Sequence, residues 1–145
     1  MCSSDLPDAQ AFFTAAGITD TTQKSAVNQL VLDLKSYSIW SKMKALYPFV
    51  GGDATKHSYN LINTANFQLT FSGGWTHSST GALPNGTNAY ANTGFNLNSN
   101  GSLNNQHISY YSRTNSNGTE VEIGALSGSY QTVLEIRTKI GRAHV

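Results

Sequence analysis

The sequence has little cysteine, little charge and no long apolar run. Its only cysteine is Cys2, which excludes a disulfide framework within the chain and a site with several thiolate ligands. Nine lysines and arginines stand against eight aspartates and glutamates. Without a basic excess we expect no nucleic-acid partner. No apolar stretch reaches the roughly 18 residues of a membrane helix, so we expect no membrane partner either.

The two ends of the chain are related through the genetic code. Residues 2–5, CSSD, can be encoded by a DNA strand whose reverse complement encodes residues 140–143, IGRA. That duplex resembles a common short-read sequencing adapter, which would also supply the last two codons. We therefore expect residues 1–6 and 139–145 to be adapter-derived and to pack against nothing specific. Residues 7–138 would then be a piece of a longer protein.

Residues 7–50 have the pattern of a helical segment. Asp8 predicts an N-cap for a helix over residues 9–16, which Gly17 would end in a left-handed conformation. A third helix is expected later in this segment, over residues 39–46. Three residues would share one of its sides: Trp40, Met43 and Tyr47.

The second helix is expected to begin at Asp20, which has Gln23 three residues later, the spacing of a capping box. Four apolar residues follow at helical spacing and form one stripe: Val27, Leu30, Val31 and Leu34. The stripe lasts about two turns, whereas a coiled coil needs three or four heptads. Packing of the stripe onto a neighbouring surface is therefore favoured over a coiled-coil seam.

Pro48 would stop the helical segment and Gly51-Gly52 would break the chain. Beyond Asp53 charge almost vanishes, and Phe67, Leu69 and Phe71 alternate with polar residues, which predicts a half-buried strand. Three further strands are expected, over residues 107–114, 119–126 and 130–137, with Asn117-Gly118 as the hairpin turn between the first two.

Short strands separated by Asn and Gly turns are typical of an antiparallel sandwich or barrel. We therefore expect an α+β chain, with short N-terminal helices over residues 7–50 and an antiparallel β-sandwich domain over residues 53–138. The domain would be incomplete if the native chain continues beyond this point.

The segment PNGTNAYANTGFNLNSNGSLNNQHISYYSRT, residues 84–114, resembles concanavalin A-like jelly rolls, including laminin-G-like domains. Asn85-Gly86 matches the turn of that pattern, Tyr90 its inward-pointing aromatic residue, and residues 108–111 its next strand. The resemblance implies a jelly-roll fold.

A second resemblance covers most of the chain. Three runs are similar to uncharacterised structural proteins of bacteriophages and prophages: residues 16–52, FSGGWTHSSTGALPNGTNAYANT and SYYSRTN. The resemblance implies a virion or tail-associated role, with other virion proteins or further copies of the chain as partners. It implies a location in the virion, and in the host cytoplasm before assembly. It carries no catalytic residues to transfer.

Trp75 and His77, in SGGWTHSST, are the candidate glycan-binding residues. An indole face can stack on the apolar face of a sugar, and nearby Asn and Ser side chains can supply hydrogen bonds. The alternative is that Trp75 fills the core at the edge of a strand.

Glu120 and Glu122 lie two residues apart on a predicted strand and would point to the same face. Glucanases of the concanavalin fold carry a third carboxylate on such a face, where this chain has Gly124 or Ala125. We therefore expect no catalytic residues and no enzyme activity.

We also expect no metal site and no cofactor. His57, His77 and His107 lack metal-ligand spacing, and no carboxylate occurs between Asp53 and Glu120 to provide hard ligands for calcium.

The sequence therefore favours a non-enzymatic, phage virion or tail-associated structural protein with a lectin-like β-sandwich that contacts host-surface glycan. One alternative is a bacterial carbohydrate-binding module on the cell surface or secreted. A second alternative is a fragment of a jelly-roll glycoside hydrolase.

Overall fold

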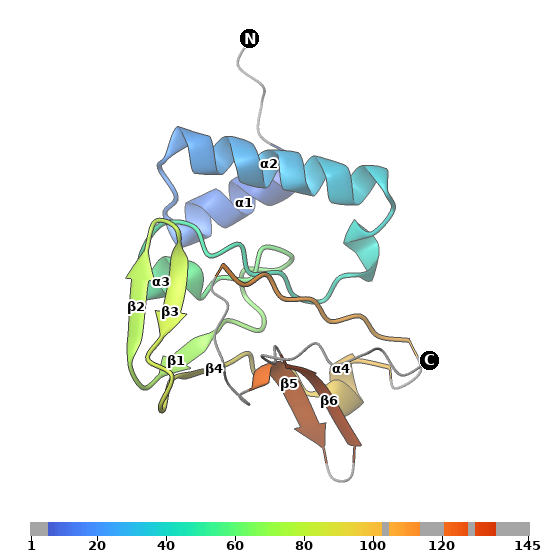
Figure 1. The fold of residues 1–145 in the computed structure, drawn as a ribbon. Helices are drawn as coiled ribbons and strands as arrows, with labels where there is room; N and C mark the ends of the chain where they lie inside the picture. Colours follow the sequence, from blue (N-terminus) through green and yellow to red (C-terminus); the bar gives the residue numbers. More distant parts are fainter. Residues whose placement is uncertain (1–5, 103–104, 114–120, 128–129, 136–145) are drawn as a thin grey trace. The chain divides into compact units, whose positions relative to one another are not determined.

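A computed structural model describes residues 6–102, 105–113, 121–127 and 130–135 (Figure 1). The chain divides into two compact units, one up to Phe95 and one from Asn96 onward. The first unit contains the helical segment and four short strands, and the second contains a short helix and a hairpin.

Helix α1 (Pro7–Ala16) begins two residues before the predicted start. Pro7 occupies the first helical position, where its fixed φ suits the helix and its missing N–H costs no bond. Asp8 is therefore not the N-cap that the sequence predicted; it lies inside the first turn and forms an ion pair with Lys35. Gly17 ends the helix with φ 64°, as predicted.

Leu6 is the N-cap of α1, and its backbone N–H donates to Asn28 Oδ1 at 2.8 Å. Its side chain is partly buried against the core. The expectation that residues 1–6 pack against nothing is therefore wrong for Leu6. Residues 1–5 and 139–145 lie outside the described residues.

Helix α2 (Thr21–Ser36) begins where the sequence predicts, because Asp20 Oδ1 accepts the backbone N–H of Gln23 at 2.8 Å. Val27 and Val31 of the predicted stripe are buried, and α2 lies beside α1 (Figure 1). The stripe therefore packs onto a neighbouring surface within the chain. The main core consists of residues Ala9, Phe12, Phe13, Ala16, Ile18, Val27, Val31 and Leu61.

The predicted third helix is reduced to one 3-10 turn, η1 (Trp40–Lys42). The backbone beyond it bonds to a side chain instead of continuing a helix. Leu46 N–H donates to Asn60 Oδ1, and Lys44 C=O accepts from Asn60 Nδ2. The prediction of a helix over residues 39–46 is therefore wrong for most of its length.

Gly51 and Gly52 break the chain as predicted, with φ values of 96° and 86°. A short helix that the sequence analysis did not anticipate follows, α3 (Ala54–His57). Asp53 caps it by accepting the backbone N–H of Lys56 at 2.9 Å.

Strand β1 (Thr70–Ser72) pairs with β4 (Tyr90–Asn92), and strand β2 (Trp75–Ser78) pairs with β3 (Gly81–Pro84), both antiparallel. The predicted strand around residues 67–71 is therefore realised only in part.

Phe67 has φ 56°, and its carbonyl accepts the Tyr47 hydroxyl at 2.5 Å rather than a ladder bond. Burial raises the pKa of Tyr47 to about 12, so this hydroxyl stays protonated and remains a donor. The Tyr47 hydroxyl therefore helps to hold Phe67 at a positive φ, which is incompatible with a β-strand.

In the second unit, α4 (Leu97–Asn100) precedes the hairpin of β5 (Val121–Ser127) and β6 (Tyr130–Glu135). The two predicted strands over residues 119–126 and 130–137 are confirmed where they are described. The predicted strand over residues 107–114 is wrong for residues 107–113, which form no strand. Thr114 and the predicted Asn117-Gly118 turn lie outside the described residues.

The α+β class is confirmed, but the described residues contain three separate two-stranded sheets and no closed sandwich or jelly roll. Gly73, with φ 78°, directly follows β1 and ends it after three residues. Tyr90 is 62% exposed, so its expected inward position is also wrong. Among the described helices, none is long and apolar enough to cross a membrane.

Candidate functional site

Five rings from separate parts of the first unit form one aromatic cluster: Phe49, His57, Phe71, Trp75 and His77. The rings of Phe71 and His77 meet edge to face with centroids 4.7 Å apart. Phe49 makes a similar contact with His57 at 5.5 Å. The cluster links α3 to strands β1 and β2.

The structure brings the two predicted site residues together. Trp75 and His77 occupy alternate positions of β2, so both point to the same face. Their rings are stacked, with centroids 6.2 Å apart and an interplanar angle of 28°.

Trp75 is half-buried, and its indole N–H is engaged by the backbone. Nε1 donates to Ser72 C=O at 3.0 Å and lies 3.3 Å from Tyr90 C=O. The indole therefore joins β2 to the β1–β4 pair, and its polar edge is not available to a ligand.

His57 is buried and its two ring nitrogens both have partners. Nε2 accepts the backbone N–H of Gly52 at 3.3 Å, so Nε2 carries no proton. Nδ1 must then carry the proton of the neutral ring, which it donates to His77 Nδ1 at 2.9 Å. Burial, followed by the neighbouring His77, lowers the pKa of His57 to about 4, which agrees with a neutral ring.

The histidine pair does not extend to a larger ligand set. Within the described ranges no group of three or more His, Cys, Asp or Glu side chains is placed to hold a metal ion. His107 belongs to the second unit and is exposed.

An asparagine turn stands next to Trp75. Asn85 Oδ1 accepts the backbone N–H groups of Thr87 and Asn88, and Asn85 Nδ2 donates to Asn88 Oδ1 at 2.8 Å. Gly74 N–H also donates to Asn88 Oδ1, at 3.3 Å, and Asn85 N–H donates to Gly74 C=O. The side chains thus hold the turn against the start of β2.

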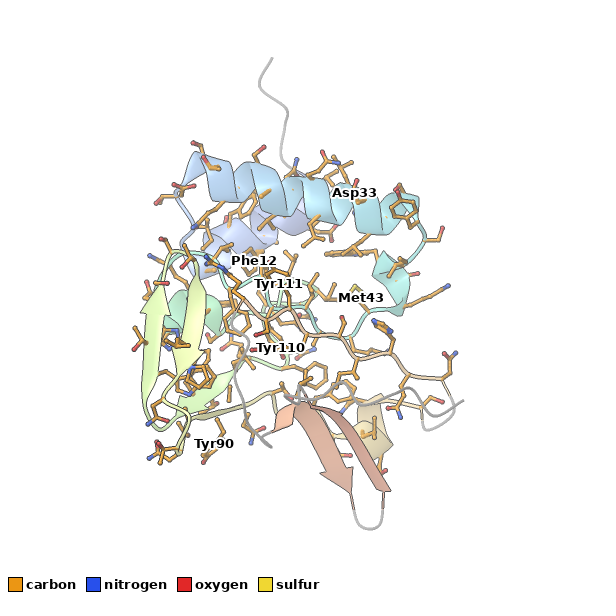
Figure 2. The ribbon with its side chains drawn as sticks, viewed as in Figure 1. Phe12, Asp33, Met43, Tyr90, Tyr110 and Tyr111 are labelled. Carbon is orange, nitrogen blue, oxygen red and sulfur yellow. The ribbon has the colours of Figure 1, made fainter. Side chains whose placement is uncertain are left out.

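Tyr90 lies two residues after Asn88, the last residue of this turn, and is exposed. Figure 2 places it at the end of the first unit that lies away from α1 and α2. The sequence analysis did not select Tyr90 as a binding residue, because the jelly-roll resemblance assigned it to the interior. Its position two residues after a turn rich in asparagine was the available signal.

Gly73 makes the close approach of β1 and the asparagine turn possible. A Cβ at this position would lie 2.2 Å from Asn88 C=O, and the residue has φ 78°. Gly94 also has positive φ, 65°, but a Cβ there would have no heavy atom of the described residues within 4 Å.

We expect Gly73→Ala to lower the free energy of unfolding by about 2 kcal/mol more than Gly94→Ala. Both variants place alanine at a positive φ, but only the Cβ at residue 73 would clash with the backbone of the asparagine turn. Urea unfolding of the two variants measures the difference. Equal losses would contradict the close approach.

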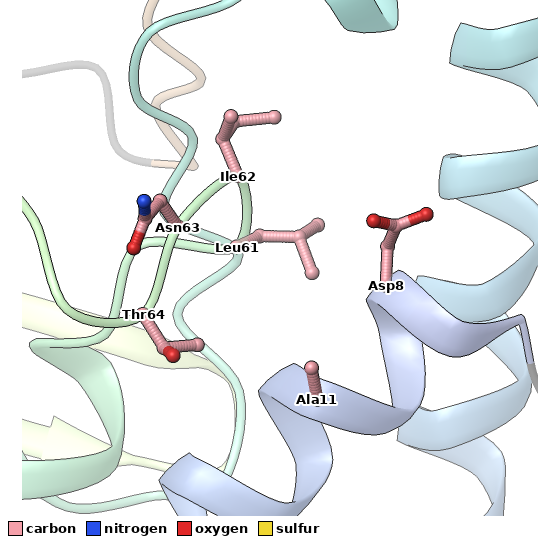
Figure 3. Close-up of a pocket in the computed structure, with 6 residues that line it drawn as sticks. All are labelled: Asp8, Ala11, Leu61, Ile62, Asn63 and Thr64. Carbon is pink, nitrogen blue, oxygen red and sulfur yellow. The ribbon is translucent and has the colours of Figure 1, made fainter.

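A separate, open pocket of about 220 Å³ lies between α1 and the loop that precedes β1 (Figure 3). Its lining residues are Asp8, Ala11, Leu61, Ile62, Asn63 and Thr64. The only charged lining residue is Asp8, which is already paired with Lys35. The pocket therefore offers no unpaired charged side chain to a ligand.

The two predicted strand carboxylates cannot be located as a pair. Glu120 lies outside the described residues, and only the backbone of Glu122 is described, at a register shift between Val121 and Ile123.

Comparisons of the chain with protein-family models, with curated proteins and with solved structures found no significant match.

Proposed function

We propose that the chain is a non-enzymatic, virion or tail-associated structural protein that contacts host-surface glycan through Tyr90 and the asparagine turn at residues 85–88. The observation that carries the glycan contact is the exposed Tyr90 ring beside a turn held in place by side-chain amides.

The chemistry of this surface suits a sugar. A tyrosine ring offers a broad apolar face with a polar tip, and it loses little conformational freedom on binding. Thr87 and the two asparagines of the turn are exposed and carry hydroxyl or amide groups. Because the turn is already ordered by its own hydrogen bonds, little further ordering is needed when a ligand binds.

Trp75 helps to position this surface rather than binding the sugar itself. Its indole N–H lies near Tyr90 C=O, so the position of the indole helps to fix the start of β4. This role differs from the direct stacking that the sequence analysis considered for Trp75 and His77.

The virion role rests on the resemblance of the sequence to phage structural proteins. The apolar stripe of α2 packs against α1, and its residues Val27 and Val31 are buried within the chain. Contacts with other virion proteins or with further copies of the chain would therefore use surface outside this stripe.

A glycan array with matched tyrosine variants tests the proposal. Tyr90→Ala is expected to weaken binding by at least tenfold, because the stacking face is lost. Tyr37→Ala removes a tyrosine that is 74% exposed at the end of α2 and should leave binding unchanged.

Equal binding by both variants would contradict the role of Tyr90. If no glycan is bound, the glycan contact is contradicted and only the structural role remains. Release of shortened sugars from the array would contradict the non-enzymatic part.

A further inference from the structure

The β2–β3 hairpin is joined to the helical part of its unit by a few polar contacts. Gln23 Nε2, on α2, donates to Ser79 C=O between β2 and β3 at 3.3 Å, while its Oε1 accepts Gly51 N–H, before α3, at 3.0 Å. A second polar contact is the bond between the Nδ1 atoms of His57 and His77. Among these contacts, only the histidine pair has side chains that can take up a proton, because glutamine and the backbone do not titrate.

Neither ring of this histidine pair can bind an additional proton while the pair is closed, that is, while the hydrogen bond between the two rings is intact. A proton on His57 Nε2 would face the N–H of Gly52, which now donates to that atom. A proton on His77 Nδ1 would face the proton that His57 Nδ1 donates. Protonation of either ring therefore requires that at least one of these hydrogen bonds breaks.

The geometry points to a proton-operated latch: we propose that protonation of the His57–His77 pair in mildly acidic solution releases the β2–β3 hairpin from α3. Release would separate the stacked rings of Trp75 and His77 from Phe49 and His57. The inference does not depend on glycan binding.

The other charged groups near the pair do not change this conclusion. Asp53 caps α3 and its charge favours a protonated His57, but this effect is smaller than those of burial and of His77. Lys56, on the same helix, forms an ion pair with Asp53 at 3.0 Å. The remaining rings of the aromatic cluster, Phe49, Phe71 and Trp75, carry no titratable group.

The direction of the pH dependence follows from the pKa of His57, which is about 4 when the latch is closed and 6.5 ordinarily. A group with a lowered pKa binds protons more weakly in the closed state than in the open state. The stabilisation of the closed state by the latch is therefore fully present above the ordinary pKa. It is lost progressively as the pH falls toward 4.

Amide hydrogen exchange followed by NMR between pH 7.5 and 4.5, corrected for intrinsic exchange rates, tests the latch. We expect amides of residues 75–83 to lose protection by at least tenfold, while amides around Val27 and Val31 keep theirs. Loss of protection in both regions together would indicate global unfolding and overturn the proposal. Titration of the imidazole ¹⁵N shifts near the ordinary pKa with an intact hairpin would also overturn it.

Three variants separate the histidine pair from its surroundings. In His77→Gln the new amide oxygen can accept from His57 Nδ1 but cannot titrate, so opening should take up at most one proton instead of up to two. The logarithm of the opening constant should accordingly change about half as steeply with pH.

Asp53→Asn keeps a good helix cap, and His107→Gln removes an exposed histidine of the second unit. His107→Gln should leave the pH dependence unchanged, and Asp53→Asn should keep the loss of protection in acidic solution, because both histidines of the pair remain. An unchanged slope in His77→Gln, or a lost response in Asp53→Asn, would overturn the latch.

Discussion

Replacement of Asn60 by leucine is expected to lower the free energy of unfolding by about 4 kcal/mol or more. Asn60 is fully buried, and its Oδ1 accepts the backbone N–H groups of Leu46 and Ile62, both at 3.0 Å. Its Nδ2 donates to Lys44 C=O and Asn66 C=O, both at 3.2 Å. Leucine has a similar size but satisfies none of these four groups, and each buried group left without a partner costs about 1–3 kcal/mol.

Asn63→Ala is the matched control for this variant. Asn63 is three positions away and exposed, and its side chain accepts only the backbone N–H of Ala65 among the described residues. Its loss should cost about 0.5 kcal/mol, in the usual range for surface substitutions. Chemical denaturation of both variants measures the difference. Similar losses of unfolding free energy would show that Asn60 does not hold the loop at residues 44–46 to the loop at residues 60–66.

Phe12→Ala is expected to cost about 3–5 kcal/mol, because Phe12 is 1% exposed at the centre of the main core. Figure 2 places its ring below α1, and it meets Phe13 edge to face with centroids 6.2 Å apart. Alanine would leave a cavity between α1, α2 and Leu61, and the surrounding structure can close such a cavity only in part.

Phe12→Leu and Leu32→Ala are the controls for this prediction. Leucine keeps most of the apolar volume and should cost less than half as much as alanine. Leu32 is 42% exposed on α2, so its truncation should change stability by about 0.5 kcal/mol. A loss below about 1 kcal/mol in Phe12→Ala, measured by thermal or urea unfolding, would contradict the packing of α1 on α2.

The helices were the most predictable part of the fold, because their signals are local. The cap at Asp20 and the stripe that contains Val27 and Val31 depend on residues three and four positions apart, and the structure has both. Gly17 and Gly51-Gly52 were predictable for the same reason, since glycine adopts positive φ without a steric penalty.

The loops were not predictable, because their hydrogen bonds join residues far apart in the sequence. Asn60 bonds to residues 14 and 16 positions earlier, and these bonds stop the expected third helix. Tyr47 bonds to Phe67, 20 positions later, and the bond shortens the expected strand. Nothing in the local pattern of either segment indicates such a partner.

The candidate site was predicted in part. Trp75 and His77 stand two residues apart on a strand, which is enough to place them on one face. The partner of His77 is His57, 20 residues earlier, and no spacing rule connects the two. Tyr90 was assigned to the interior by analogy with a sandwich, whereas its strand pairs with β1 in a two-stranded sheet of the described residues and the ring is exposed.

The most direct test of the proposed glycan contact is an amide-resolved NMR titration of the chain with the glycan that the array selects. The proposal predicts that the largest shift changes fall on residues 73–75 and 85–92, which surround Tyr90 and the asparagine turn. Shift changes confined to other residues, or no saturable change at any residue, would contradict it.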